Sequence, residues 1–292
     1  MQPSASPAFV AGLGFLIAGV SFKMSLFPFN LWLPDVYQGA PSEVTALLAA
    51  SAKKAGFAAF LRLIPASGFV VSPALASPLL SFSGAIAVLS FLIMGFGSVV
   101  ALVQKNVKRM IAYSIIVHAG FLAMGLAAAT ALGYLGLLFH VLIHALMAVG
   151  IFLLFVVLEE QGLQELEHYN GLGKRAPFVS ILLTIFLLSL TGIPPLAGFL
   201  SKFILWSSVM EVGYTWLAMS AVVASAISTY FYFLILRRVW GYPPEKDSPF
   251  PAMRWNQKFA LVVPAVLIIV LGVYPNPALF FIQKVVEAGV SF

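Results

Sequence analysis

The segment Gly192-Ile-Pro-Pro-Leu-Ala-Gly-Phe-Leu-Ser-Lys202 interrupts a long apolar run and ends in a lysine. Proline has no amide N–H, and its ring crowds the carbonyl one turn back, so Pro194 and Pro195 must break any helix that forms here. The apolar flanks are long enough to continue as helix on both sides of the break. The segment therefore predicts a broken helix that carries an ionisable side chain within an apolar run.

A second segment, Lys23-Met-Ser-Leu-Phe-Pro28, repeats this combination near the N-terminus, with Pro28 as the residue that breaks the helix. A lysine near the centre of a bilayer costs about 2.5 to 3.5 kcal/mol on insertion scales. Ionisable groups beside broken helices are typical of ion pathways. We therefore predict a functional role for Lys23 and Lys202, with snorkelling of their ammonium groups to the membrane interface as the alternative.

The composition is that of an all-α integral membrane protein. Hydrophobic residues make up 61% of the chain and charged residues 9%, and the mean hydropathy is +1.02, far from the values of soluble domains. The chain has no cysteine, which excludes disulfides and thiolate-bound iron–sulfur clusters. The net charge of +6 does not indicate nucleic-acid binding, because the basic residues fall mainly in short loops between apolar runs.

The apolar runs predict about eight transmembrane helices in one domain, residues 1–292. The runs lie near residues 8–31, 43–65, 79–103, 110–130, 134–158, 178–209, 214–236 and 258–275. The last stretch, Pro277 to Phe292, is apolar with two charges and is expected to lie along the membrane interface.

The loop charges predict an orientation for a multi-pass protein of the cell inner (plasma) membrane. One side has only Arg62 and Lys284 near helix ends, and the other has Lys105, Lys108, Arg109, Lys174, Arg175, Arg237, Arg238, Lys246, Arg254 and Lys258. The positive-inside rule makes the second side cytoplasmic. An even number of spans then places both termini on the non-cytoplasmic side.

Several strings along the chain are more specific than its composition. They are Phe27-Pro-Phe-Asn-Leu-Trp-Leu-Pro-Asp-Val-Tyr-Gln-Gly-Ala-Pro41, Ser51-Ala-Lys-Lys-Ala-Gly-Phe57, Lys108-Arg-Met-Ile-Ala-Tyr-Ser114 with His118-Ala-Gly120, Leu172-Gly-Lys-Arg-Ala-Pro177 and Leu190-Thr-Gly-Ile-Pro-Pro-Leu-Ala-Gly-Phe-Leu-Ser-Lys202. Together they resemble the antiporter-like subunits of respiratory complex I, and within them subunit N, the mitochondrial subunit 2 type, of NADH-quinone oxidoreductase. The resemblance covers nearly the whole chain.

The resemblance implies a proton-conducting subunit of fourteen helices with two inverted repeats, each holding a broken helix and a lysine. This chain resembles helices seven to fourteen, and the family's first six helices have no counterpart in it, so we expect it to be N-terminally truncated. Residues 1–66 would be the remnant of the first repeat, residues 79–240 the second repeat, and residues 257–292 the C-terminal helix and tail.

Carried over to this sequence, the resemblance implies a proton pathway through Lys23, Lys53, His118 and Lys202. Histidine and lysine side chains can exchange protons, which agrees with such a role. Neighbouring residues on a helix point about 100° apart, so Lys53 and Lys54 are not both expected to face one polar row. The family register favours Lys53, which leaves Lys54 facing a neighbouring subunit or another buried partner; the reverse assignment is the alternative.

His140 and His144 stand four residues apart on one helical face. They could belong to the proton relay, form a packed and hydrogen-bonded pair, or bind a metal. No carboxylate or cysteine within that apolar run completes a metal site, so we predict no metal. This stretch departs from the usual subunit N pattern and is more similar to the sister antiporter-like subunits.

Two further polar residues follow Lys23. Asn30 stands where the family commonly has histidine, which keeps a hydrogen-bonding group but removes a titratable one. Asp35, flanked by Pro34 and Tyr37, is expected to be either a turn residue or an ion-pair partner for a neighbouring subunit.

The function that the resemblance implies is proton translocation through the membrane arm of a redox-driven NADH-quinone oxidoreductase. This chain would be a non-redox subunit of the translocase without catalytic residues or cofactors, and NADH, flavin, iron–sulfur clusters and quinone would be bound by partner subunits. Its partners would be other membrane-arm subunits, including the sister antiporter-like subunits, and the lipid bilayer, with no nucleic acid. The alternatives are a subunit of a multi-subunit cation/proton antiporter or membrane-bound hydrogenase, and a non-transporting assembly or scaffold subunit.

Overall fold

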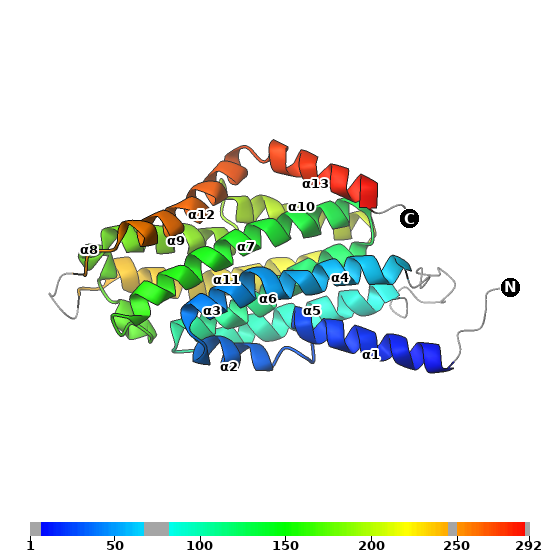
Figure 1. Ribbon diagram of the computed structural model, residues 1–292, viewed down its shortest axis with the longest axis horizontal. Helices are drawn as coiled ribbons and strands as arrows, with labels where there is room; N and C mark the ends of the chain where they lie inside the picture. The colour runs from blue at the N-terminus through cyan, green and yellow to red at the C-terminus, as the bar shows by residue number, and fades with distance from the viewer. Residues whose placement is uncertain (1–6, 67–81, 245–249, 290–292) are drawn as a thin grey trace.

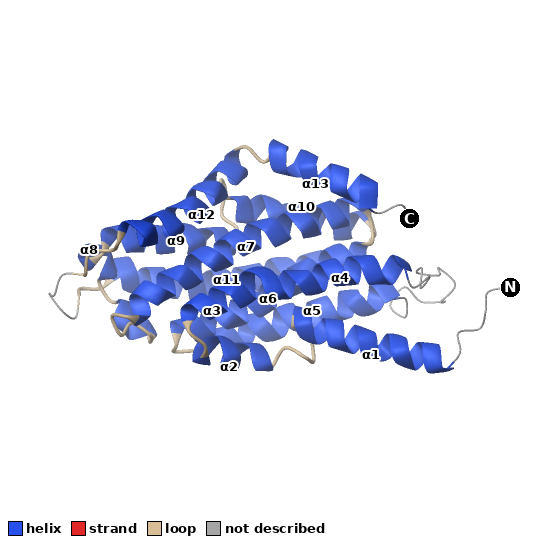
Figure 2. Ribbon diagram, in the orientation of Figure 1, coloured by secondary structure: helices blue, strands red, loops and turns tan. Residues whose placement is uncertain are grey.

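The computed structural model describes residues 7–66, 82–244 and 250–289 as a bundle of helices (Figure 1 and Figure 2). Within these ranges the only strand-like pairing is an isolated bridge between Asn106 and Glu165. Three parts of the sequence predictions fall outside the described residues: the start of the third span at 79–81, Lys246, and the end of the C-terminal tail at 290–292.

Among the described residues, six helices are long and apolar enough to cross a bilayer. The first is a continuous run of α3 (Ser42–Leu47), the π-helical turn η1 (Leu48–Ala52) and α4 (Lys53–Ala66). The others are α5 (Phe82–Leu102), α6 (Val107–Ala128), α7 (Ala131–Glu159), α11 (Thr215–Gly241) and α12 (Trp255–Val273). These six agree with six of the eight predicted spans to within a few residues.

The two remaining predicted spans are the two that contain the helix-breaking prolines, and both are interrupted. The first is helical as α1 (Pro7–Met24) and then breaks, and the next helix, α2 (Trp32–Gly39), begins just beyond the predicted end at residue 31; the second divides into α9 (Pro177–Thr191) and α10 (Ala197–Glu211). Ser25 and Gly192 adopt left-handed conformations, with φ of 57° and 89°, directly after the first half of each span. The predicted breaks are therefore confirmed, but Asp35, for which a turn was one of the two expectations, lies on the short helix α2.

Helix α6 lies at the centre of the bundle, and its whole membrane-spanning stretch is buried within the chain. It packs along α5 through small residues that allow a close approach. A Cβ added at Gly120 would lie 3.1 Å from the carbonyl oxygen of Ser90, and the Ser90 hydroxyl donates a hydrogen bond of 2.7 Å to the Gly120 carbonyl. Side chains of α6 are thus shielded from lipid even in this chain alone.

The connections with the most basic residues meet at one end of the bundle. The bridge between Asn106 and Glu165 joins the α5–α6 connection to the α7–α9 connection. The Gly171 N–H donates to the Arg238 carbonyl at 3.0 Å, which joins the α7–α9 connection to the end of α11, where the third basic connection begins. The short helices η3 (Leu166–Tyr169) and α8 (Leu172–Arg175) lie at this end, whereas α13 (Asn276–Gly289) extends toward the other end of the bundle, on the edge opposite to α1 (Figure 1). The predicted cytoplasmic loops therefore share one side; that this side is the cytoplasmic one stays a prediction.

Candidate functional site

Six titratable side chains are buried along the middle of the bundle, on four different helices. They come from α4, α6, α7 and α10, and they are Lys53, Lys54, His118, His140, His144 and Lys202. Burying this many ionisable groups in a membrane protein is costly, and such groups mark ion and proton pathways. We call this set the buried row.

The buried row begins on α4 and α7, where Lys54 contacts His144. The Lys54 Nζ lies 2.8 Å from His144 Nδ1 and also donates a hydrogen bond to the Ala49 carbonyl. An ammonium group only donates hydrogen bonds. With Lys54 charged, His144 Nδ1 accepts and the ring carries its proton on Nε2, an atom that is buried without a hydrogen-bond partner among the described residues.

The row continues from α7 to α6 through the histidine rings. The ring centroids of His144 and His118 are 4.7 Å apart, and those of His118 and His140 are 5.2 Å apart. His118 Nδ1 and His140 Nε2 are 3.1 Å apart and share a hydrogen bond. Three imidazoles from two helices are therefore in mutual contact.

Ser201 on α10 fixes the proton positions of the last two histidines. Its hydroxyl donates to the Gly198 carbonyl at 3.0 Å, so its oxygen is left to accept from His140 Nδ1 at 2.9 Å. With its proton on Nδ1, neutral His140 must accept at Nε2, and His118 then donates from its own Nδ1. Proton donors and acceptors are thus arranged in one direction from His118 to Ser201.

Lys202 follows Ser201 and is held by the broken helix. Its ammonium donates to the carbonyl oxygens of Leu190 at 2.8 Å and Thr191 at 3.0 Å, and lies 3.3 Å from the Ser225 hydroxyl. The two carbonyls belong to the last turn of α9, where the break leaves them without intrahelical partners. The negative end of the α9 dipole also favours a cation there. The proline break therefore creates the binding site for the lysine that follows it.

An aromatic ring links this lysine to the histidines. The Lys202 Nζ lies 4.7 Å from the centre of the Phe121 ring, an arrangement that stabilises a cation over an aromatic face. The same ring is 5.7 Å from His118, between centroids.

The two adjacent lysines of α4 are both buried, but they contact different helices. Lys54 contacts His144, and Lys53 donates to the Ile115 carbonyl of α6 at 3.0 Å. The π-helical turn η1 directly precedes them, and its wider i to i+5 geometry affects the direction in which both lysines point. The contact with His144 favours the reverse assignment, in which Lys54 faces the histidines; which of the two lysines carries protons stays a prediction.

Lys23 lies apart from the buried row. It is exposed in the last turn of α1, and its aliphatic stem packs near Gly56 of α4, where an added Cβ would be 3.3 Å from Lys23 Cγ. Lys23 of α1 therefore packs against α4 at Gly56, about one helical turn after Lys53. Its predicted place in the proton pathway stays a prediction.

His140 and His144 do not converge as a metal-binding pair. Both nitrogens of His140 are engaged by His118 and Ser201, and His144 Nδ1 contacts an ammonium. Within the described ranges, no group of three or more histidine, cysteine, aspartate or glutamate side chains is arranged to hold a metal ion.

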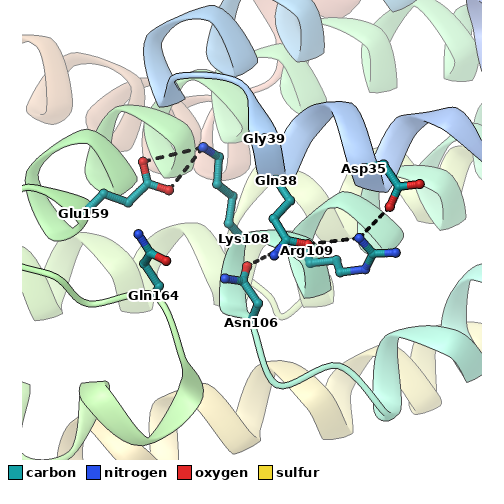
Figure 3. Close-up of a pocket in the computed structure, with 8 residues that line it drawn as sticks. All are labelled: Asp35, Gln38, Gly39, Asn106, Lys108, Arg109, Glu159 and Gln164. Atoms are coloured by element: carbon teal, nitrogen blue, oxygen red, sulfur yellow. Dashed lines mark hydrogen bonds and ion pairs between the residues drawn. The ribbon is translucent and has the colours of Figure 1, made fainter.

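A second polar site, not singled out by the sequence analysis, lies at the loop-rich end. It is a pocket of about 320 Å³ (Figure 3), and we call it the loop-end pocket; its lining residues are Asp35, Gln38, Gly39, Asn106, Lys108, Arg109, Glu159 and Gln164. Two ion pairs cross it, Lys108 to Glu159 at 3.1 Å and Arg109 to Asp35 at 2.6 Å. Asp35 is not a turn residue, because it lies on α2, and it pairs with Arg109 within the chain; its side chain is 70% exposed, and a further pairing with a neighbouring subunit stays a prediction. In the sequence, the adjacent pair Lys108 and Arg109 at the start of α6 was the feature that could have indicated this site.

Comparison with known proteins identifies the family. Residues 2–228 match the family described as "NADH:quinone oxidoreductase/Mrp antiporter, TM". The chain belongs to this family. It is 37% identical to F(420)H(2) dehydrogenase subunit N of Methanosarcina mazei, covering 98% of this chain and 59% of that protein. It is 39% identical to NADH-quinone oxidoreductase subunit N of Heliobacterium modesticaldum, covering 93% and 56%.

Solved structures agree with this membership. Respiratory complex I from Thermus thermophilus with bound NADH contains a chain that matches this antiporter-family chain with a TM-score of 0.83 and 27% identity, over 98% of this chain and 59% of that one. The membrane-bound sulfane sulfur reductase, an archaeal respiratory membrane complex, matches with a TM-score of 0.83 and 31% identity, over 94% and 55%. The predicted resemblance to antiporter-like subunits is therefore confirmed, and the chain spans somewhat more than half the length of these relatives.

Proposed function

We propose that this chain conducts protons within the membrane arm of a redox-driven respiratory complex of the NADH-quinone oxidoreductase type. The observation that carries the proposal is the contact sequence Lys54, His144, His118, His140 and Ser201, with Lys202 as the next residue on α10; all six are buried. Every member either holds an exchangeable proton or can accept one.

The chemistry of the buried row favours protons over metal cations. Its members present mainly nitrogen atoms, whereas hard cations prefer several oxygen ligands around a fixed cavity. An imidazole can take a proton on one nitrogen and release another from the second nitrogen. A proton that arrives at His118 Nε2 releases the Nδ1 proton to His140, and His140 in turn releases its Nδ1 proton to Ser201.

The last step ends at Lys202. The Ser201 hydroxyl has to rotate away from the Gly198 carbonyl before it passes its proton on toward the neutral amine of Lys202. The amine becomes an ammonium ion that the carbonyls of Leu190 and Thr191 hold in place. After each transfer, His118 and His140 carry their protons on Nε2 instead of Nδ1. Both rings must return to the Nδ1 tautomer before the next proton can follow.

The redox chemistry is assigned to partner subunits. The relatives are named as subunits of an F(420)H(2) dehydrogenase and of NADH-quinone oxidoreductases, and we infer that NADH or another hydride donor, flavin, iron–sulfur clusters and quinone are bound by other chains of the complex. Sister antiporter-like subunits of the membrane arm are the proposed neighbours. A scaffold role would not require six buried titratable side chains, so the row favours transport.

The test compares proton pumping with electron transfer in the assembled complex. Membrane vesicles that contain Lys202→Ala are expected to pump at least about tenfold more slowly per electron transferred, because a positioned proton carrier has been removed. Lys174→Ala, an exposed lysine of α8, is the matched control and is expected to pump normally. An unchanged proton-to-electron ratio in Lys202→Ala would refute the proposal.

A further inference from the structure

The loop-end pocket has a closed floor made by one ion pair. Lys108 is almost fully buried, and its ammonium donates to the Ala40 carbonyl at 2.7 Å and lies 3.1 Å from Glu159 Oε1. The Ser42 hydroxyl donates to the other carboxylate oxygen, Oε2, at 2.6 Å. Glu159 is partly exposed toward the pocket, as Figure 3 shows, so its carboxylate stands between water and the interior.

The three helices that meet at this floor also lead to the buried row. Ser42 starts the continuous run α3–η1–α4, and Lys53 lies eleven positions later, about 16 Å along the helix. Lys108 and His118 are ten positions apart on α6, about 15 Å. The third helix, α7, carries His144 and ends at Glu159. One seam between three helices therefore connects the pocket with the row.

The seam is mainly apolar between its two ends, and the buried Thr45 hydroxyl on α3 donates to the backbone carbonyls of Tyr37 and Pro41. Helical spacing places Ala46 and Ala49 on the face of α3 and η1 that carries Ser42, and Phe152 and Phe155 on the face of α7 that carries Glu159. All four are buried. A proton needs water or another carrier to cross such a stretch, and the Lys108–Glu159 pair lies where the pocket meets the seam.

We propose that the loop-end pocket is the entrance by which protons reach the buried row, that Glu159 collects them, and that its ion pair with Lys108 closes the entrance between transfers. This inference rests on the proposed function. A hydronium ion gives its proton to the Glu159 carboxylate, which leaves water and a neutral carboxyl group. The neutral carboxyl no longer holds the Lys108 ammonium by charge, so the floor opens and water enters the seam.

The proton then leaves Glu159 for the row. The carboxyl group passes it through the admitted water to the Lys54–His144 pair when that pair lacks a proton, and the carboxylate that remains attracts Lys108 again. No oxidant or reductant is required. Removing one partner of a buried ion pair is strongly unfavourable, which ties opening of the floor to the protonation of Glu159.

The charges of the loop-end pocket do not suit an anionic ligand. Its two cations, Lys108 and Arg109, are already paired with Glu159 and Asp35. A phosphate or carboxylate ligand would have to displace one of these internal carboxylates. A pocket whose charges cancel in pairs fits water and hydronium better than an anion.

The first experiment substitutes the proposed collecting residue. In vesicles with the assembled complex, Glu159→Gln is expected to lower the proton-to-electron ratio severalfold, and Glu159→Asp is expected to keep most of it. The matched control is Glu160→Gln, because Glu160 is the next residue in the sequence and is exposed. Pumping by Glu159→Gln at the level of Glu160→Gln would overturn the proposal, provided that both variants assemble to the same amount on native gels.

The second experiment measures water access directly, which separates the entrance from pumping as a whole. Because the chain has no cysteine, a single Ala46→Cys reports on the middle of the seam. It is expected to react with a small maleimide severalfold faster when combined with Lys108→Met than with Lys105→Met, an exposed control. Equal rates would overturn the gating role of the ion pair. Normal pumping by Lys202→Ala would instead refute the proposed function, whatever the labelling shows.

Discussion

The imidazoles of His118 and His140 are 3.1 Å apart, from Nδ1 to Nε2, and their ring planes are inclined by only 16°. This hydrogen bond joins the central helix α6 to α7, and Ser201 continues it to the broken helix α10. The proposed proton path through three helices thus depends on the His140 ring, which is engaged at both nitrogens.

Replacement of His140 is therefore expected to interrupt the buried row. His140→Phe retains the volume of a ring but has no nitrogen, so proton pumping is expected to fall severalfold in the assembled complex. His168→Phe, on the exposed η3 turn, is expected to pump normally. Equal proton-to-electron ratios in the two variants would mean that His140 is only a packed core residue.

Lys202→Arg is expected to be a poor substitute for the wild-type residue. Arginine keeps the positive charge beside the Leu190 and Thr191 carbonyls but stays protonated at any working pH, so it cannot release a proton to the next carrier. We expect assembled complex with impaired pumping, measured as dye quenching in vesicles against the rate of quinone reduction. Full pumping would show that Lys202 acts only as a fixed charge.

The contact of Lys54 with His144 predicts that Lys54 matters for transport as well as Lys53. Lys54→Met removes the ammonium next to the first imidazole of the row and leaves His144 Nδ1 without its donor. Pumping is expected to fall relative to Lys105→Met, an exposed control. If Lys54→Met pumped normally and only Lys53→Met lost pumping, Lys53 and not Lys54 would be the lysine of α4 that takes part in proton transfer.

The second broken helix depends on a close backbone approach at Gly198. A Cβ at this position would overlap the Ser189 carbonyl of α9, so Gly198→Ala is expected to destabilise the fold by about 1–3 kcal/mol. Gly95→Ala on α5 is the control, because nothing lies within 4 Å of its added Cβ. Thermal unfolding in detergent measures both, and a Gly198→Ala midpoint equal to that of Gly95→Ala would contradict the close packing.

The proposed orientation can be measured with single cysteines, since the chain supplies no background thiols. Lys174→Cys lies at the loop-rich end and is expected to resist a membrane-impermeant reagent added outside intact cells. Arg62→Cys, near the end of α4 on the opposite side, is expected to react. The reverse pattern would place the loop-end pocket outside the cytoplasm.

Much of the fold could be predicted from the sequence because hydropathy and proline act locally. Runs of about twenty apolar residues must cross a bilayer as helices whatever surrounds them. Likewise, Pro28 and the Pro194–Pro195 pair must interrupt a helix in any fold. The place of Lys202 directly after its break followed from the same reasoning, and the family resemblance added His118 and Lys53.

Only the tertiary structure decided which side chains meet. Lys54 of α4 contacts His144 of α7, 90 residues away in sequence, and no periodicity in the sequence predicts the π-helical turn that precedes Lys54. Glu159 contacts Lys108 because the end of α7 returns to the start of α6, 51 residues away in sequence. Lys23 and Lys202 are alike in sequence, yet one is exposed and the other buried. The physical reason is the same in each case: apolar character and helix breaks belong to a segment, whereas contact and burial depend on how segments pack against one another.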